Sequence, residues 1–230
     1  MRTHSTPLSS SRWRSSRFSR RAPWRFRAAR ALLRVLIGGV FRVRAEGLER
    51  LPAGPHVLAC NHLSWIDPFV LLGWLPAAPR IHFLGRRSSI YNRRWKRWVL
   101  EFMGGVIPVE SGKIKELSGA VRGVLERGGV VAIFPEGRVG TVEGVLQRLR
   151  LGVGHFAASN HAPLVAAGLS GTRELWRGKR ITIRIGVTVE PTGILDADMA
   201  AIEAAMRDVL PPYQEPPGAR PWPWLTTLFR

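Results

Sequence analysis

A histidine and an aspartate, His62 and Asp67, lie five residues apart in the stretch VLACNHLSWIDPFVLL at 57–72. Histidine can take a proton from an alcohol near neutral pH, and a carboxylate that holds the ring fixes its tautomer and stabilises the imidazolium that forms. The apolar run before the pair predicts a buried strand, and Asp67 followed by Pro68 predicts the start of a helix with Asp67 as its N-cap. The pair is therefore expected where a strand ends, the usual place for chemistry in α/β proteins.

A second strand end carries polar residues of a different kind. The stretch VVAIFPEGRVG at 130–140 ends in Glu136, Gly137 and Arg138. Glycine lets backbone N–H groups approach an anion, arginine offers a planar fork to a phosphate, and glutamate can accept from a hydroxyl. Alone, the first pair reads as a helix cap beside a loop histidine and the second stretch as an ordinary turn. Together they predict a base near a phosphate-binding turn.

These blocks resemble the glycerophospholipid acyltransferase family, whose representative member is lysophosphatidic acid acyltransferase. The family pattern N-H-x-S-x-x-D matches 61–67, and the pattern F-P-E-G with a following arginine matches 134–138. Two further stretches resemble family blocks, GGVIPVESG at 104–112 and APLVAAGLSGT at 162–172. The resemblance spans roughly residues 40 to 190, and four blocks in the family's order argue against chance.

The resemblance implies an enzyme that acylates a lysophospholipid. His62 would act as general base on the free glycerol hydroxyl, Asp67 would orient it, and Glu136, Gly137 and Arg138 would hold the glycerol and phosphate. The acyl donor would be acyl-CoA or acyl carrier protein (acyl-ACP), as a substrate, and no resident cofactor or metal is implied. The expected acceptor is 1-acyl-glycerol-3-phosphate, which gives phosphatidic acid, and a lysolipid or glycolipid without the phosphate stays open.

The sequence departs from the family in two places. The family often has threonine between the glycine and arginine of the second block, whereas Arg138 follows Gly137 directly. The family arginine thought to hold the acceptor phosphate is replaced by Ser111. Lys113 is the nearest candidate replacement, because an ammonium can neutralise phosphate without bidentate geometry, and Arg86 and its neighbour at 87 are the other candidates. Alternatively, Lys113 simply opens the exposed face of a helix, or the acceptor lacks the phosphate.

Alternating strand and helix patterns predict an α/β fold with a mostly parallel central sheet flanked by helices, preceded by an N-terminal amphipathic membrane-associating helical segment. We expect a disordered basic tail at 1–22, the amphipathic segment at 23–43, the acyltransferase α/β domain at 44–210 and a Pro/Trp-rich tail at 211–230. Strands are expected at 56–60, 81–84, 106–109, 130–134, 164–169 and 181–189, and helices at 67–75, 92–103, 114–127, 148–159 and 196–209. His56 and His82 are expected to be solvated strand ends.

The charge of the chain is concentrated at its beginning. The formal net charge is +19, and twelve arginines precede the first acid, Glu46. The tail resembles an organellar transit peptide and equally suits an anionic surface. Segment 23–43 suits a helix in the lipid headgroup region or, alternatively, one packed on its own domain with a solvated basic face. The C-terminal Trp222 and Trp224 belong to an apolar cluster that either packs on the domain or touches a membrane.

These features predict the partners. No run of apolar residues is long enough for an ordinary membrane span, and a peripheral or monotopic association with the cytoplasmic face of a phospholipid membrane is expected. The single cysteine, Cys60, lies in an apolar strand and is expected to be a buried structural thiol. A basic protein that binds nucleic acid or lipid without catalysis is the rival class, but no nucleic acid is expected because the arginines join an amphipathic segment rather than a recognition fold.

Overall fold

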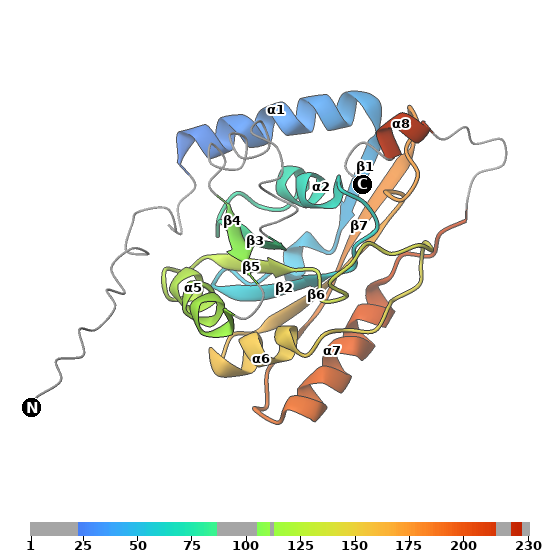
Figure 1. Ribbon diagram of the computed structural model, residues 1–230. Helices are drawn as coiled ribbons and strands as arrows, with labels where there is room; N and C mark the ends of the chain where they lie inside the picture. The colour runs from blue at the N-terminus through green and yellow to red at the C-terminus, as the bar shows by residue number, and fades with distance from the viewer. Residues whose placement is uncertain (1–22, 87–104, 111–112, 215–221, 227–230) are drawn as a thin grey trace, which may run out of the picture.

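A computed structural model describes residues 23–86, 105–110, 113–214 and 222–226, which contain one twisted seven-stranded sheet (Figure 1). The spatial order of its strands is β1-β7-β6-β2-β5-β3-β4. Every neighbouring pair is parallel except β6 and β7. The strands are β1 (Arg42–Glu46), β2 (His56–Cys60), β3 (Ile81–Arg86), β4 (Val106–Val109), β5 (Val130–Ile133), β6 (Leu164–Ser170) and β7 (Arg180–Val189). The predicted mostly parallel sheet is confirmed.

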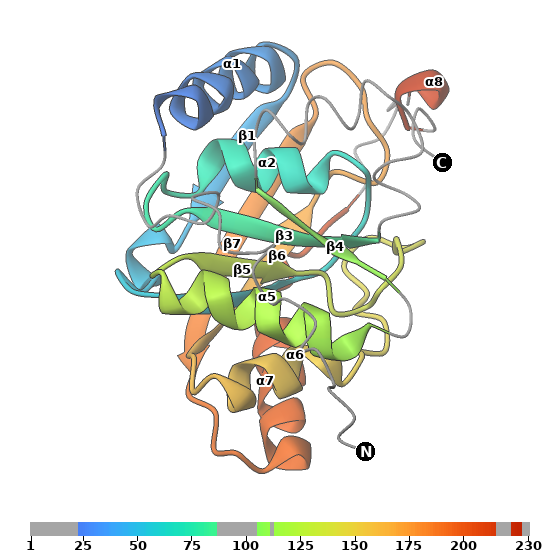
Figure 2. The ribbon, with the colours of Figure 1, turned by 60° about the vertical axis from the view of Figure 1, so that its left-hand side comes forward.

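Helices cover both faces of the sheet (Figure 2). One face carries α1 (Trp24–Val40) and α2 (Asp67–Trp74), and the other carries α5 (Ile114–Glu126), α6 (Gly152–Ser159) and α7 (Leu195–Val209). Two short helices, η2 (Leu48–Arg50) and α8 (Pro223–Thr226), complete the described elements. The predicted helix at 92–103 lies outside the described residues. The helix predicted at 148–159 begins only at Gly152, because the Arg150 N–H donates to the Pro135 carbonyl, 2.8 Å away.

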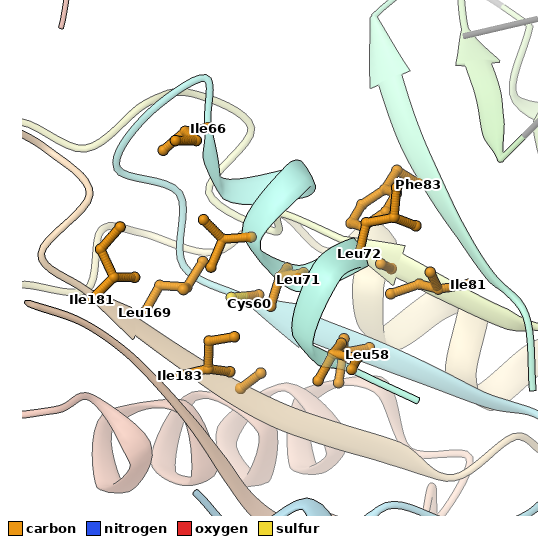
Figure 3. Close-up of a cluster of buried hydrophobic side chains, with 14 of the residues drawn as sticks. Leu58, Cys60, Ile66, Leu71, Leu72, Ile81, Phe83, Leu169, Ile181 and Ile183 are labelled. Carbon is orange, nitrogen blue, oxygen red and sulfur yellow. The ribbon is translucent and has the colours of Figure 1, made fainter. Parts of the chain in front are cut away.

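The central strand β2 is buried along its whole length, which is why its sequence HVLAC shows no polar alternation. Leu58 and Cys60 point to the face covered by α1 and α2, whereas Val57 and Ala59 point to the opposite face. Figure 3 shows Leu58 and Cys60 in the first of these two cores, below Leu71 of α2. Cys60 is the expected buried thiol, and burial raises its pKa well above the usual value. His56 and His82 are buried as well, so the expectation that they are solvated is wrong.

Helix α1 packs on its own domain and also exposes apolar side chains. Phe26 and Ile37 are buried, and the Arg30 guanidinium donates to the carbonyls of Leu72 and Leu75 at the end of α2. The helix ends three residues before the predicted 43, because the chain becomes extended at Phe41 and enters β1. Apolar side chains also lie on the exposed side of the helix, namely Trp24, Leu32, Val35 and Leu36. Within the described part of the chain, no helix is long and apolar enough to cross a membrane.

The parallel strands bring the predicted site residues to one edge of the sheet. His62 follows β2, Glu136 follows β5, and Arg86 is the last residue of β3. Because β2, β3 and β5 run in the same direction, their carboxyl ends share this edge, which we call the carboxyl edge. The ends of β4 and β6 lie at the carboxyl edge too, since both strands are parallel to these neighbours.

Candidate active site

His62 and Asp67 are in direct contact. The Nδ1 atom of His62 lies 2.8 Å from Oδ2 of Asp67, and the same carboxylate oxygen accepts the backbone N–H groups of Leu63 and Ser64 at 2.7 and 2.8 Å. The Asp67 side chain is fully buried, while 19% of the His62 side chain is exposed. The carboxylate therefore faces the loop that carries the histidine. It makes no capping bond to α2, so the predicted role of Asp67 as N-cap is wrong, whereas the predicted pairing is confirmed.

The hydrogen bond to Asp67 fixes the chemistry of the imidazole. A carboxylate only accepts hydrogen bonds, so Nδ1 carries the ring proton and Nε2 keeps its lone pair. Phe134 stacks on the ring at a centroid distance of 4.2 Å and holds its plane. The side chain of Asn61, the residue before the histidine, exchanges two hydrogen bonds with the backbone of Leu169 in β6, at 3.0 and 2.7 Å. The imidazole is thus positioned by the Asp67 carboxylate and the Phe134 ring, and its loop is attached to β6 through Asn61.

Glu136 is a buried carboxylate behind the histidine loop. Its Oε1 accepts the backbone N–H of Gln147 at 3.3 Å. Burial raises its pKa above the usual value, while the backbone N–H groups of Gln147 and His62 partly oppose that shift. The Glu136 carboxylate therefore links the turn after β5 to the loop that carries His62.

The residues after Glu136 form a turn that involves two arginines with different contacts. Gly137 has a φ of +68°, which favours glycine, and the guanidinium of Arg150 lies where a β carbon would be. Arg138 is exposed and its Nε donates to Oε1 of Gln147 at 2.5 Å. Glu136 thus contacts the loop of His62, Gly137 and Arg138 follow it in the turn, and the Arg150 side chain reaches this turn from two residues before α6.

Residues 42–170, more than half of the chain, match the family described as Acyltransferase. The chain belongs to this family. A 1-acyl-sn-glycerol-3-phosphate acyltransferase of Bacillus subtilis (strain 168) is 27% identical over 187 residues, which are 77% of this chain and 89% of the relative. The crystal structure of the 1-acyl-sn-glycerophosphate (LPA) acyltransferase PlsC from Thermotoga maritima has the same fold, with a TM-score of 0.66, 16% identity and coverage of 80% of this chain and 78% of that one.

The comparisons confirm the resemblance drawn from the four blocks, and the protein is an acyltransferase. The matched range contains both the His62–Asp67 pair and the turn at 136–138. Among the described residues, no group of three or more histidine, cysteine or acidic side chains could hold a metal ion.

Two residues of the acyltransferase site were not predicted from the sequence. Arg150 lies in no recognised block, and only the fold brings it to Gly137. Glu143 is half-buried and accepts the backbone N–H groups of Gly171 and Arg173 at 3.0 to 3.1 Å, which links the segment after β5 to the residues just after β6. The available signal was that Glu143 is the single acid between 137 and 151, in an otherwise basic segment.

The two candidate replacement cations differ in what the structure describes. Lys113, at the start of α5, pairs with Glu110 at 2.7 Å and with Glu116 at 3.9 Å, so nearby carboxylates offset its charge. Arg86 lies at the carboxyl edge as the last residue of β3, paired in register with Val109 of β4. Its neighbour at position 87 lies outside the described residues. The roles of Lys113 and Arg86 in binding substrate stay predictions.

Proposed function

We propose that this acyltransferase moves a fatty acyl group from acyl-CoA or acyl-ACP to the free glycerol hydroxyl of a lysophospholipid. The preferred acceptor is 1-acyl-glycerol-3-phosphate and the product is phosphatidic acid. The observation that carries the proposal is the 2.8 Å contact between His62 Nδ1 and the buried Asp67 carboxylate. This contact leaves Nε2 of a partly exposed imidazole as a base for an alcohol.

The reaction needs no acyl-enzyme. Nε2 of His62 takes the proton of the acceptor hydroxyl while the hydroxyl oxygen attacks the thioester carbonyl. Asp67 stabilises the imidazolium that forms, because its carboxylate contacts Nδ1 and is buried away from water. When the tetrahedral intermediate collapses, the carbon–sulfur bond breaks and the thiolate takes the proton. The products are the ester and the free thiol of coenzyme A or of the carrier protein.

The turn after β5 supplies positive charge for an acceptor phosphate. Arg138 is exposed and Arg150 lies against Gly137, and no carboxylate among the described residues pairs with either guanidinium. Two such forks beside the base can hold a phosphate monoester while its glycerol hydroxyl faces His62. Arg150 therefore offers the cation that the family supplies at the position of Ser111. Glu136, by contrast, supports the turn from within, because it is buried and already accepts from the backbone.

A phospholipid surface is the proposed partner of α1. Its exposed Trp24, Val35 and Leu36 are apolar, and Trp24 has 73% of its surface in water. An aromatic side chain at the end of an otherwise apolar stripe suits the lipid headgroup region. We place the enzyme at the cytoplasmic face of the membrane, where both thioester donors are available. The exposed Trp224 of α8 is a further candidate contact.

The test is an acyl-transfer assay on the purified full chain with a panel of acceptors and both donors. The acceptors are 1-acyl-glycerol-3-phosphate, a lysophospholipid whose phosphate is esterified, and a glycolipid with a free hydroxyl. We expect the highest kcat/KM with the phosphate monoester, because its charge matches the two arginines. Transfer to the glycolipid alone would replace the proposed acceptor but keep the mechanism. No transfer to any acceptor would refute the proposed function.

A further inference from the structure

The segment 137–151, between β5 and α6, presents an unusual outer surface next to the active site. We call it the valine segment. Its valines at 142 and 145 leave 54% and 53% of their surface in water. The side chains exposed along it are otherwise apolar or basic: Val139, Leu151, Arg138, Arg148 and Arg150, with Thr141 between them.

The valine segment is held in place although it is neither helix nor strand. Leu146 and Leu149 are buried in the core beneath α5, α6 and α7. The Gly140 N–H donates to the carbonyl of His62 at 2.6 Å, which fixes the start of the segment against the catalytic loop. The exposure of the valines is therefore imposed by this anchoring, with the leucines turned in and the valines turned out.

In the valine segment the acidic side chain points into the protein, whereas the basic side chains are exposed. Glu143 is its only acid, and its carboxylate turns inward to the N–H groups of Gly171 and Arg173. Partial burial raises the pKa of the Glu143 carboxyl, and the N–H groups of Gly171 and Arg173 and then the Lys179 ammonium partly oppose that shift. The charged side chains that remain on the outer surface of the segment are consequently all arginines.

We propose that the valine segment contacts the surface of an anionic phospholipid membrane beside His62. The proposal rests on the function proposed above and names the surface at which that site works. Arginines can pair with lipid phosphates while valines enter the headgroup region, where exposed apolar area is stabilised. An acidic carrier protein would complement the arginines but would have no evident use for three exposed valines. The lipid surface therefore fits both features, and it brings the acceptor hydroxyl to His62 without transfer through water.

The experiment measures binding of the full chain to phosphatidylcholine vesicles with and without phosphatidylglycerol. The variant is Val142→Asp with Val145→Asp, and the matched control is Val187→Asp, since Val187 in β7 has 59% of its surface exposed and lies away from the carboxyl edge. We expect the double variant to weaken binding to mixed vesicles about tenfold or more, because two apolar contacts are lost and two anions are added. The control should bind like the wild type.

A second substitution, which should increase vesicle binding, tests the same proposal in the opposite direction. Val142→Trp should strengthen vesicle binding several-fold, whereas Val187→Trp should not, because aromatic side chains prefer the headgroup region. Equal binding by the wild type, the double Asp variant and the Trp variant would overturn the proposal. The proposal would also be overturned if the double variant bound vesicles normally and lost only the reaction with acyl-ACP, since the occupant would then be the carrier protein.

The proposal can fail separately from the proposed function. Transfer to a short-chain, monomeric 1-acyl-glycerol-3-phosphate reads catalysis without a membrane, and the double variant should keep wild-type kcat there because neither valine touches the base. That result also shows that the variant is folded. If the wild type transfers to no lysolipid, the proposed function is wrong, while the vesicle measurements still decide whether the valine segment binds lipid.

Discussion

The guanidinium of Arg150 occupies the space that a β carbon on Gly137 would fill. Gly137 also has a φ of +68°, a conformation that costs an L-residue energy. The backbone conformation favours glycine at this position, and any β carbon here would displace the flexible Arg150 side chain. Gly144, in the same segment, is a control that shows the backbone effect alone, because it has a φ of +72° and no atom within 4 Å of its missing β carbon.

Gly137→Ala should lower the free energy of unfolding by about 1–2 kcal/mol through backbone strain, and Gly144→Ala should cost about the same. Only Gly137→Ala should also raise the KM for 1-acyl-glycerol-3-phosphate, because it displaces Arg150. Chemical denaturation and steady-state kinetics measure the two effects. If Gly144→Ala raised KM as much, strain alone would explain the result and Arg150 would lose its role.

Arg150→Ala and Lys113→Ala compare the two candidates for the missing phosphate cation. Arg150 has no carboxylate partner among the described residues, whereas Lys113 pairs with Glu110 and Glu116. We expect Arg150→Ala to raise the acceptor KM about 10–100-fold with little change in kcat, since a charge-assisted contact contributes about 1.5–3 kcal/mol. Lys113→Ala should change KM less. The reverse order would assign the phosphate to Lys113.

The stability contributed by Glu143 should depend on pH. Burial raises the pKa of this carboxyl, so the folded protein binds the proton more tightly than the unfolded chain does. The stability of the wild type relative to Glu143→Gln is therefore greatest below the usual carboxyl pKa and decreases as pH rises through the raised one. Denaturation of both proteins across the acidic range measures this. A relative stability that increased with pH would contradict the assigned direction.

Asp67 should be needed for the fold as well as for the chemistry. Asp67→Ala leaves the buried N–H groups of Leu63 and Ser64 without an acceptor, which should cost about 2–5 kcal/mol of unfolding free energy. Asp67→Asn keeps one acceptor oxygen and should be more stable than the alanine variant, yet its kcat should fall about 10²–10⁴-fold because the imidazolium loses its counter-charge. Thermal unfolding and turnover, measured on both variants, separate the roles. If Asp67→Asn turned over at the wild-type rate, Asp67 would have no role in the mechanism.

The sequence predicted the parts of the site that depend on local patterns. His62 and Asp67 meet because a buried strand ends before the histidine and a helix starts at the aspartate, and the four residues between them allow one tight loop. Strand boundaries were predicted well because fully buried strands such as β2 and β5 read as short continuous apolar runs. The parallel order then places the ends of these strands at one edge without further information.

Contacts between distant residues could not be predicted in this way. Spacing does not decide whether Asp67 turns to its own helix or to the loop before it, and the N-cap prediction failed for that reason. Arg150 contacts Gly137 through the tertiary fold. Leu146 and Leu149 are buried in the core, which fixes the path of the chain between the two residues. The same anchoring starts α6 four residues later than its apolar pattern suggests.

The most direct test of the central claim is the turnover of His62→Ala in acyl transfer to 1-acyl-glycerol-3-phosphate, followed by release of the free thiol. The matched control is His155→Ala, since His155 is an exposed residue of α6 outside the described site. We expect His62→Ala to keep its fold by circular dichroism, to keep an acceptor KM close to that of the wild type, and to lose about 10³-fold or more in kcat. The control should turn over like the wild type. Near-normal turnover by folded His62→Ala would show that another group takes the proton.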